Sequence, residues 1–189
     1  AAAAEGNKVD LYRLPRHVIP TRYDLRLEPD LATFTFAGTE AITVTVTEPT
    51  SEVLLNAAEL EIVDATIERD GGVAHHAAVE LEEATERCRL KFATALSQGA
   101  WRLHLSFKGV LNDKLRGFYR SSYRDQQGET HSLAATQFEA TDARRAFPCW
   151  DEPAFKSVFA ATLVIDPHLT AVSNTAIRAE RVEQSKKVV

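Results

Sequence analysis

The feature that most limits the fold of this chain is a repeated pattern in which every second residue is apolar. Residues 41–47 read AITVTVT, so isoleucine and valine alternate with threonine. Successive side chains of a β-strand point to opposite faces, and the pattern therefore predicts a strand with one buried face and one face of threonines. Residues 101–107 repeat it. The predicted buried face of this second strand holds Trp101, Leu103, Leu105 and Phe107.

Other segments rich in β-branched and aromatic residues predict further strands. With the two above, the predicted strands cover residues 23–27, 33–36, 40–47, 61–69, 77–81, 87–92, 101–107, 118–123, 129–135, 157–165, 171–174 and 177–184. Gly38 predicts a bulge or turn between two of them. Helical periodicity is scarce, although residues 140–156 could hold one or two short helical turns. Regular strand spacing with turn signals predicts an all-β fold, a sandwich or a related layered sheet.

The charge and the cysteines of the chain limit which classes of protein it can belong to. The net charge is −5, with acidic and basic residues interleaved, whereas a nucleic-acid-binding protein needs a basic stripe. No apolar run approaches the roughly 18 residues of a membrane span, and no signal peptide is visible. Cys88 and Cys149 form no CxxC motif. We interpret them as two separate thiols in a reducing compartment, with a disulfide as the alternative, and expect a cytoplasmic protein.

The usual signs of a metal site or a nucleophile are missing from the sequence. None of the six histidines stands in H-E-x-x-H, the helical spacing that places two imidazoles on one zinc ion. His75 and His76 are adjacent on a predicted strand, where they would point to opposite faces and could not easily chelate. Cys149 has no base nearby in the sequence and is interpreted as an inert thiol. We therefore expect no metal ligand and no catalytic residue within this chain.

Residues 136–159 read TQFEATDARRAFPCWDEPAFKSVF and form the most informative segment. The segment crowds acidic, basic and aromatic residues together with two prolines. A plain surface loop would be richer in Gly, Ser and Asn, and a plain strand would alternate. A long, ordered connection of this kind is typical of a functional loop. We call residues 136–159 the signature segment.

The signature segment closely resembles one found in zinc-dependent aminopeptidases of the puromycin-sensitive and alanyl aminopeptidase type. The matching residues are Gln137, Glu139, Asp142, Ala143, Arg144, Phe147, Pro148, Cys149, Asp151, Glu152, Pro153 and Lys156. Residues 14–25, 53–57 and 111–121 resemble further segments of that family. The resemblance covers residues 11–189 and implies a single β domain, a saddle-like, twisted β-sheet sandwich of the aminopeptidase N-terminal type. Residues 1–10 match nothing and are expected to be a disordered or expression-derived start.

The resemblance implies a role in substrate binding for two residues. Glu139 occupies the position of the family's glutamate that anchors the free ammonium of the substrate. Gln137 stands where the family has a glutamine that lines the pocket for the first side chain. A carboxylate in a partly dry pocket suits an ammonium, because charge-assisted hydrogen bonds are short and strong there. Without the motif, Glu139 would be interpreted as an ordinary surface carboxylate.

The resemblance also implies a larger enzyme. In the family, the zinc motif and the Gly-Ala-Met-Glu-Asn exopeptidase motif lie beyond the point where this sequence stops. The full-length parent would be a zinc metallo-aminopeptidase that removes single amino acids from peptide N-termini, with zinc held by its own catalytic domain. This chain would bind no zinc and would be inactive alone. Its partners would be peptide N-termini and that catalytic domain, with no nucleic acid and no membrane span.

Two interpretations stay open for the other residues of the signature segment. Its charged residues either contact substrate or form a salt-bridged scaffold, and we favour the scaffold because interleaved opposite charges usually neutralise each other. These residues are Asp142, Arg144, Arg145, Asp151, Glu152 and Lys156. The aromatic residues Phe147, Trp150 and Phe155 are expected to be packing anchors rather than substrate stackers.

The structure of the C-terminus and the function of the chain also leave alternatives open. Residues 185–187 have the polarity of a turn, and Val188 and Val189 begin an apolar run. Family members continue into a further strand here, so the chain is expected to lack its last strand and to self-associate at high concentration through this edge or the signature segment. The alternative functions are a non-catalytic β-sandwich binding module, or a superfamily relative with another outcome, such as a transcription-associated or epoxide-hydrolysing member.

Overall fold

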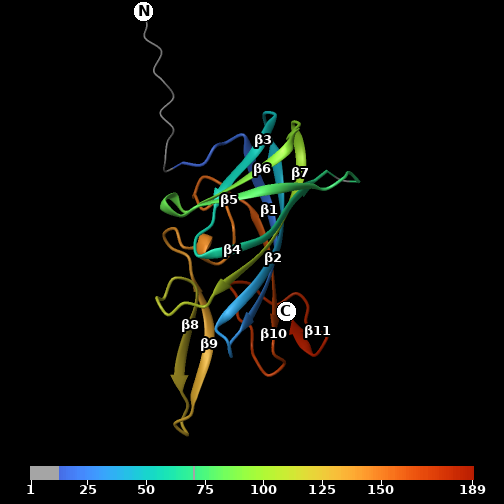
Figure 1. Cartoon of the computed structure of the whole chain (residues 1–189). Coiled ribbons are helices and arrows are strands. Elements are labelled where there is room, and N and C mark those ends of the chain that lie inside the picture. The colour runs from blue at the N-terminus through green and yellow to red at the C-terminus, as the bar shows by residue number, and fades with distance from the viewer. Residues whose placement is uncertain (1–12, 70) are drawn as a thin grey trace, which may run out of the picture.

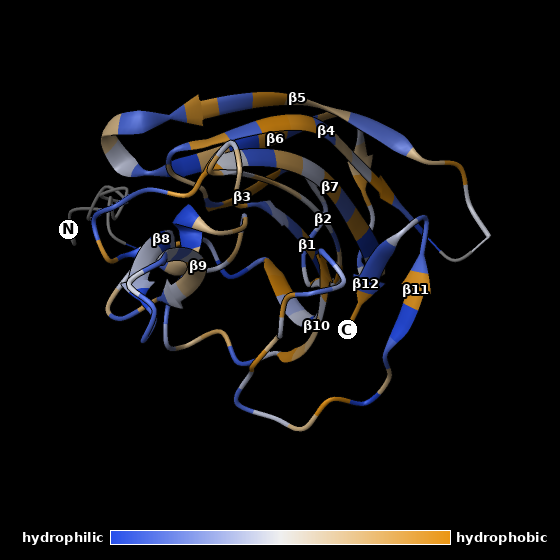
Figure 2. Ribbon diagram, turned by 90° about the horizontal axis from the view of Figure 1, so that it is seen from below, coloured by the Kyte–Doolittle hydropathy of each residue, from blue (hydrophilic) through white to orange (hydrophobic). Residues whose placement is uncertain are grey.

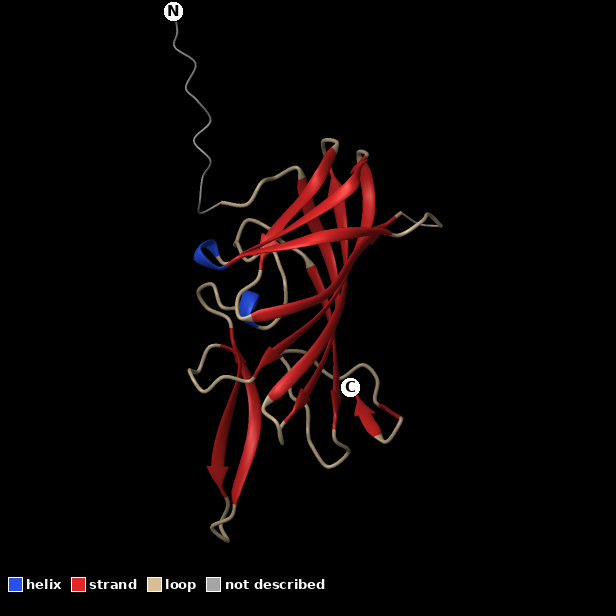
Figure 3. Cartoon of the chain, viewed as in Figure 1, coloured by secondary structure: helices blue, strands red, loops and turns tan. Residues whose placement is uncertain are grey.

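The computed structural model describes residues 13–69 and 71–189, and the regular secondary structure of this part of the chain is almost entirely β-strand (Figure 3). The residues expected to form a disordered or expression-derived start, 1–10, lie outside the described residues. The described elements are β1 (Val18–Asp30), β2 (Thr35–Val46), β3 (Thr50–Asn56), β4 (Leu60–Glu68), β5 (His75–Glu82), the 3-10 helix η1 (Glu83–Thr85), β6 (Arg87–Leu96), β7 (Gly99–Val110), β8 (Gly117–Arg124), β9 (Thr130–Gln137), the 3-10 helix η2 (Ala143–Arg145), β10 (Val158–Ile165), β11 (Arg181–Glu183) and β12 (Lys186–Val188).

Ten of these strands form one sheet, in the order β11-β12-β10-β1-β2-β7-β4-β5-β6-β3. β1 pairs antiparallel with β2 and parallel with β10, whereas the other neighbours are antiparallel. The sheet is curved into an arch, and the separate β8–β9 hairpin extends away from it (Figures 1 and 2). The predicted all-β fold is confirmed, and a large sheet with a second, two-stranded sheet is consistent with the predicted β-sandwich.

The core follows the alternation seen in the sequence. On β7, Trp101, Leu103, Leu105 and Phe107 are all buried, as predicted. Their neighbours on β2 include Ile42, Val44 and Val46, each with no exposed surface. The apolar face of two central strands therefore forms the centre of the core.

The prediction of a bulge or turn at Gly38 is wrong. β2 runs unbroken from Thr35 to Val46 and pairs with β7 residue by residue. A Cβ atom at position 38 would lie 2.3 Å from the ring of Phe107, so the glycine leaves room for that ring on the neighbouring strand. The glycine is thus required by packing, and the strand starts at Thr35 rather than Thr33 because residues 31–34 form a turn.

The C-terminal strands are shorter than predicted. Residues 171–174 and 177–180 form no strand, and Val172 and Ile177 are 86% and 54% exposed. The turn lies at Gln184 and Ser185, which both have positive φ, rather than at residues 185–187. β-branched content suggested strands here, but no neighbouring strand supplies a hydrogen-bonding ladder for residues 171–180 in the described sheet.

The end of the chain is itself paired on both sides. β12 lies between β10 and β11, and Val189 exchanges two backbone hydrogen bonds with Leu163. The outermost strand is β11, which is only three residues long and carries Arg181 and Glu183. Short, charged edge strands discourage pairing with another molecule. A further strand after Val189 and self-association of the chain stay predictions.

Both cysteines are buried and free, which confirms the interpretation as two separate thiols. Burial raises the pKa of the Cys88 thiol to about 12 and holds the pKa of the Cys149 thiol well above its usual range. A thiol is nucleophilic only as the thiolate, so both are protonated and unreactive at neutral pH. Across the described ranges, no helix has the length and apolar character needed to cross a membrane.

Candidate functional site

The signature segment connects the β8–β9 hairpin to the middle of the main sheet. It leaves the hairpin at Gln137, the last residue of β9, and enters β10, which runs parallel to β1. Between these strands lies η2, which confirms the predicted short helical turn. The connection is therefore anchored at both ends by strands, and residues 138–157 lie between a projecting hairpin and the core sheet (Figure 1).

The second half of the segment is tied to the end of β3 by Asn56. The backbone N–H of Asn56 donates to the carbonyl of Cys149 at 2.7 Å, and the N–H of Cys149 donates back at 2.9 Å. The side-chain oxygen of Asn56 accepts the N–H of Asp151 at 3.2 Å, while its amide nitrogen donates to the carbonyl of Glu86 at 3.3 Å. Asn56 belongs to a segment that resembles the family, but its clamping role was not predicted.

Aromatic packing fixes the middle of the segment. Phe147 is buried, and its ring makes edge contacts with Tyr23 at 6.3 Å and with Phe138 at 5.8 Å between centroids. Trp150 is also buried, and its backbone N–H donates to the hydroxyl of Tyr23 at 3.2 Å. The prediction that Phe147 and Trp150 are packing anchors is confirmed. Phe155 is half-buried, with the guanidinium of Arg16 5.9 Å from its ring centroid.

The charged residues expected to form a salt-bridged scaffold do so, with the exception of Lys156. Arg144 pairs with Asp151 at 2.9 Å and with Glu86 at 3.2 Å. Arg145 pairs with Asp142 at 2.8 Å. Glu152 accepts the backbone N–H of Leu14 and pairs with Arg13 at 3.5 Å, whereas Lys156 is exposed. Glu59 and Glu86 complete the network from outside the segment. They could not be identified from the sequence, because surface glutamates are common.

The two residues predicted to bind substrate are both exposed. Gln137 ends β9, the Phe138 ring packs against Phe147, and the next residue, Glu139, lies in the turn that follows. The next residues form a tight turn, closed by a 2.9 Å hydrogen bond from the N–H of Asp142 to the carbonyl of Phe138. The Glu139 carboxylate is thus presented from a turn whose two ends are packed and hydrogen-bonded.

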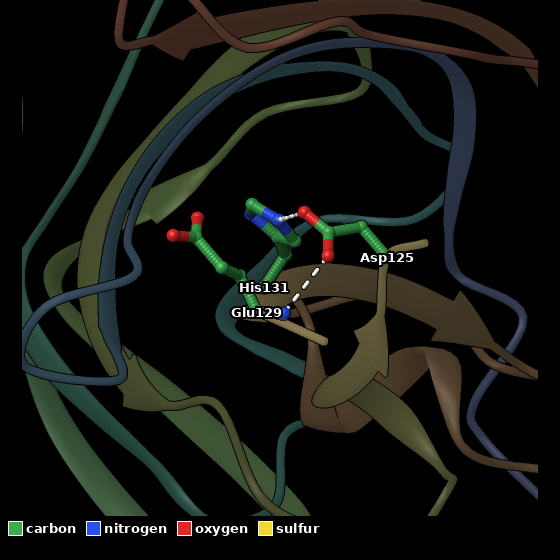
Figure 4. A group of neighbouring side chains, drawn as sticks. All are labelled: Asp125, Glu129 and His131. Atoms are coloured by element: carbon green, nitrogen blue, oxygen red, sulfur yellow. Dashed lines mark hydrogen bonds and ion pairs between the residues drawn. The ribbon is translucent and has the colours of Figure 1, made fainter. Parts of the chain in front are cut away.

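A group of possible metal ligands that the sequence did not suggest lies at the tip of the β8–β9 hairpin. Ligand atoms of Asp125, Glu129 and His131 lie within 4.8 Å of one another (Figure 4). Their arrangement already has a structural role. Asp125 Oδ1 accepts the N–H groups of Gln127 and Glu129, and its Oδ2 lies 2.8 Å from His131 Nε2. The bond to His131 lowers the pKa of Asp125. Asp125 therefore closes the hairpin turn.

The adjacent histidines have different neighbours, as the strand geometry predicted. The ring of His75 lies 6.1 Å from that of Trp101, whereas His76 lies 3.4 Å from Asp64. A shared metal ion would need both imidazoles on one side of β5. The contacts of the pair are instead those of two side chains that point to opposite faces.

We expect the chain to bind no zinc stoichiometrically. By elemental analysis, dialysed protein should contain well under one zinc ion per chain. At the hairpin tip, Asp125 Oδ2 and His131 Nε2 are already hydrogen-bonded to each other and are therefore not free to bind a metal ion. The control is the His131→Ala variant, which should give the same zinc content. Near-stoichiometric zinc that disappears in His131→Ala would contradict the prediction and would place a metal at the hairpin tip.

Comparisons with known proteins find one family and several related aminopeptidases. A family model described as the peptidase M1 N-terminal domain matches residues 19–189. Aminopeptidase M1 of Arabidopsis thaliana is 46% identical over 181 residues, and aminopeptidase M1-D of Oryza sativa subsp. japonica is 48% identical over 177. The puromycin-sensitive aminopeptidase of Caenorhabditis elegans is 40% identical over 182 residues. Each match covers 94% of this chain but only about a fifth of the relative.

Proposed function

Because the chain belongs to the peptidase M1 N-terminal domain family, we propose that it is the N-terminal domain of a zinc metallo-aminopeptidase and helps to bind the free amino end of peptide substrates. The relatives are named aminopeptidases, and the chain spans about a fifth of their length. The observation that carries the proposal is the exposed Glu139 carboxylate on a turn whose ends are packed and hydrogen-bonded. An aminopeptidase must recognise an ammonium, and a positioned carboxylate does so.

Gln137 and Glu139 divide the recognition between them. Glu139 would accept hydrogen bonds from the substrate ammonium. Gln137, which is also exposed, would contact the first side chain, since an amide offers both a donor and an acceptor without adding charge. Both residues would be covered by a catalytic domain when substrate is bound. Excluding water from the ion pair strengthens it, because the effective dielectric constant falls.

Zinc is assigned to that catalytic domain rather than to this chain. The sequence contains no H-E-x-x-H motif, and at the tip of the β8–β9 hairpin Asp125 and His131 are hydrogen-bonded to each other. Zinc bound elsewhere in the enzyme would polarise the scissile carbonyl and activate water. The task of this chain is to hold the amino end of the peptide so that the first peptide bond, and no later one, reaches that metal. The proposed location is cytoplasmic, where free thiols such as Cys88 and Cys149 are stable.

Replacing Glu139 by alanine in the full-length enzyme tests the proposal. We expect kcat/KM for aminoacyl substrates to fall at least about thirtyfold, or about 2 kcal/mol, because a desolvated ammonium loses its charged partner. Glu139→Gln should lose nearly as much, since it keeps the shape and removes the charge. Glu61 offers a matched control, as it is an exposed glutamate on β4. Unchanged kinetics for both Glu139 variants would remove this residue from the site and favour a non-catalytic binding module.

A further inference from the structure

Arg145 lies at the centre of three carboxylates that come from three separate parts of the chain. Its Nε donates to Asp142 at 2.8 Å, its Nη1 donates to Glu59 at 2.7 Å, and its Nη2 donates to Glu86. Each nitrogen of the guanidinium is thus used by a different acid. The Arg145 side chain is only 9% exposed. Each of these hydrogen bonds is charge-assisted, and those to Asp142 and Glu86 are also partly shielded from water, which makes them stronger than a surface contact.

The two distant acids are held in an uncommon backbone conformation. Glu59 has φ 57° and lies between β3 and β4, and Glu86 has φ 52° and lies between η1 and β6. A residue with a side chain adopts the left-handed region at a cost of about 1 kcal/mol or more. Such a conformation persists only where surrounding contacts outweigh that cost, and both residues contact Arg145. Two turns of the main sheet therefore hold one guanidinium.

The backbone near Arg145 is equally constrained. The N–H of Ala58 donates to the carbonyl of Arg144 at 3.0 Å, which ties η2 to the β3–β4 turn. Gly117, at the start of β8, lies so close that a Cβ there would be 2.6 Å from the Cβ of Arg145. The base of the hairpin, the end of the sheet and η2 meet at this residue.

A short path leads from this junction to Glu139. Arg145 fixes the Asp142 carboxylate, and the N–H of Asp142 closes the turn from Phe138 that carries Glu139. Glu139 itself contacts neither Arg145 nor its acids through any hydrogen bond or ion pair seen in residues 13–69 and 71–189. At the Asp142 end of the turn, the contacts that connect Glu139 to the main sheet therefore run through Asp142 and Arg145.

We propose that Arg145 is a positioning residue for the substrate-ammonium site: held by Glu59 and Glu86, it locks the Phe138–Asp142 turn and so sets the place of Glu139. The proposal rests on the function proposed above. The positioning role requires arginine at position 145, because one planar guanidinium reaches three acids in fixed directions. A lysine ammonium is instead a single point charge on a flexible stem. Lysine at this position preserves the charge but not the geometry.

The test compares Arg145→Lys, Arg145→Gln and Arg89→Lys in the full-length enzyme. Arg89 is the matched control, since it also bridges two acids, Glu52 and Glu82, but lies on β6 away from the turn. We expect Arg145→Lys to lower kcat/KM at least about fivefold, mainly through KM, and Arg145→Gln to lower it further. Arg89→Lys should change kcat/KM less than twofold. A loss in melting temperature with unchanged kinetics in Arg145→Lys would overturn the proposal.

A double variant shows whether Arg145 acts through Glu139. In a Glu139→Gln background, Arg145→Lys should cause less than a twofold further loss in kcat/KM, because residues that act as a unit are not additive. A full fivefold further loss would assign Arg145 a role independent of Glu139, leaving the proposed function intact and the positioning role overturned.

Amide exchange separates this inference from the proposed function. In the 189-residue chain, Arg145→Lys should speed exchange of the Asp142 N–H at least about tenfold, and Arg89→Lys should not. If Glu139→Gln left the kinetics unchanged, the proposed function would fail, while faster exchange would still support the locking of the turn by Arg145. Unchanged exchange in Arg145→Lys would overturn that locking. Because the exchange measurement uses Arg145→Lys, it tests the proposal even if Arg145→Gln fails to fold.

Discussion

The Trp101→Ala variant should lose about 3–5 kcal/mol of unfolding free energy, the usual cost of removing a large buried aromatic side chain. Trp101 is 8% exposed and lies on β7, the strand between β2 and β4. Its indole N–H donates to the carbonyl of Ser97 at 2.8 Å, and the guanidinium of Arg69 lies 5.0 Å from the ring centroid. Alanine would remove the packing, the hydrogen bond and the cation–π contact together.

Urea denaturation of the 189-residue chain, followed by circular dichroism, measures this effect. The Trp101→Phe variant should recover most of the lost stability, because it keeps a ring in the core and gives up chiefly the hydrogen bond to Ser97, about 1 kcal/mol. Tyr123→Ala is the control, since Tyr123 is an aromatic residue on the β8–β9 hairpin that is 54% exposed. A Trp101→Ala variant that loses less than about 1 kcal/mol would show that β7 does not depend on this side chain.

The sequence predicted what short-range patterns determine. Alternation over seven residues correctly placed the buried face of β7, because the period of a strand is a local property. Gly38 was misread for the opposite reason: the ring that requires it belongs to Phe107, far away along the chain. Strands were predicted over residues 171–174 and 177–184 from composition, but a strand also needs a neighbour to pair with, and of these residues only 181–183 have one.

In the candidate site, too, only the features that depend on local sequence could be predicted. The position of Glu139 came from a resemblance, and the aromatic anchor Phe147 from its residue type. The partners of Arg145 could not be found that way, because Glu59 and Glu86 are ordinary glutamates in the sequence. They become distinctive only when two turns of the sheet bring them to one guanidinium. Contacts between distant segments are created by the fold, and a single sequence carries no local sign of them.

Raising the pH from about 5 to 8 should destabilise the chain through Glu40. Glu40 is 3% exposed, both of its carboxylate oxygens lack a hydrogen-bond partner within the described part of the chain, and its strand neighbours are Leu25 and Leu105. Burial without a cation to pair with raises the pKa of Glu40 well above its usual range. The folded chain therefore keeps this proton at a pH where the unfolded chain has released it.

The sign of the effect follows from that difference in proton binding. Below the pKa of the unfolded state, about 4.5, both states hold the proton and Glu40 contributes no pH dependence. Above that value the unfolded state binds fewer protons, so the unfolding free energy falls by about 1.4 kcal/mol per pH unit until the pKa of the folded state is reached.

The Glu40→Gln variant isolates this contribution. Glutamine has nearly the same shape and no ionisable proton, so the difference in unfolding free energy between the variant and the unmodified chain should grow with pH in favour of the variant. The other ionisable groups are common to both proteins, so their contributions cancel in the difference. Asp24 and Glu82 have pKa values lowered mainly by hydrogen bonds to Arg22 and Arg89, so their contributions are lost only in acid, below this window. A difference that stays constant from pH 5 to 8 would mean that the Glu40 carboxyl is ionised in the folded chain throughout, and that water or a rearranged donor satisfies it.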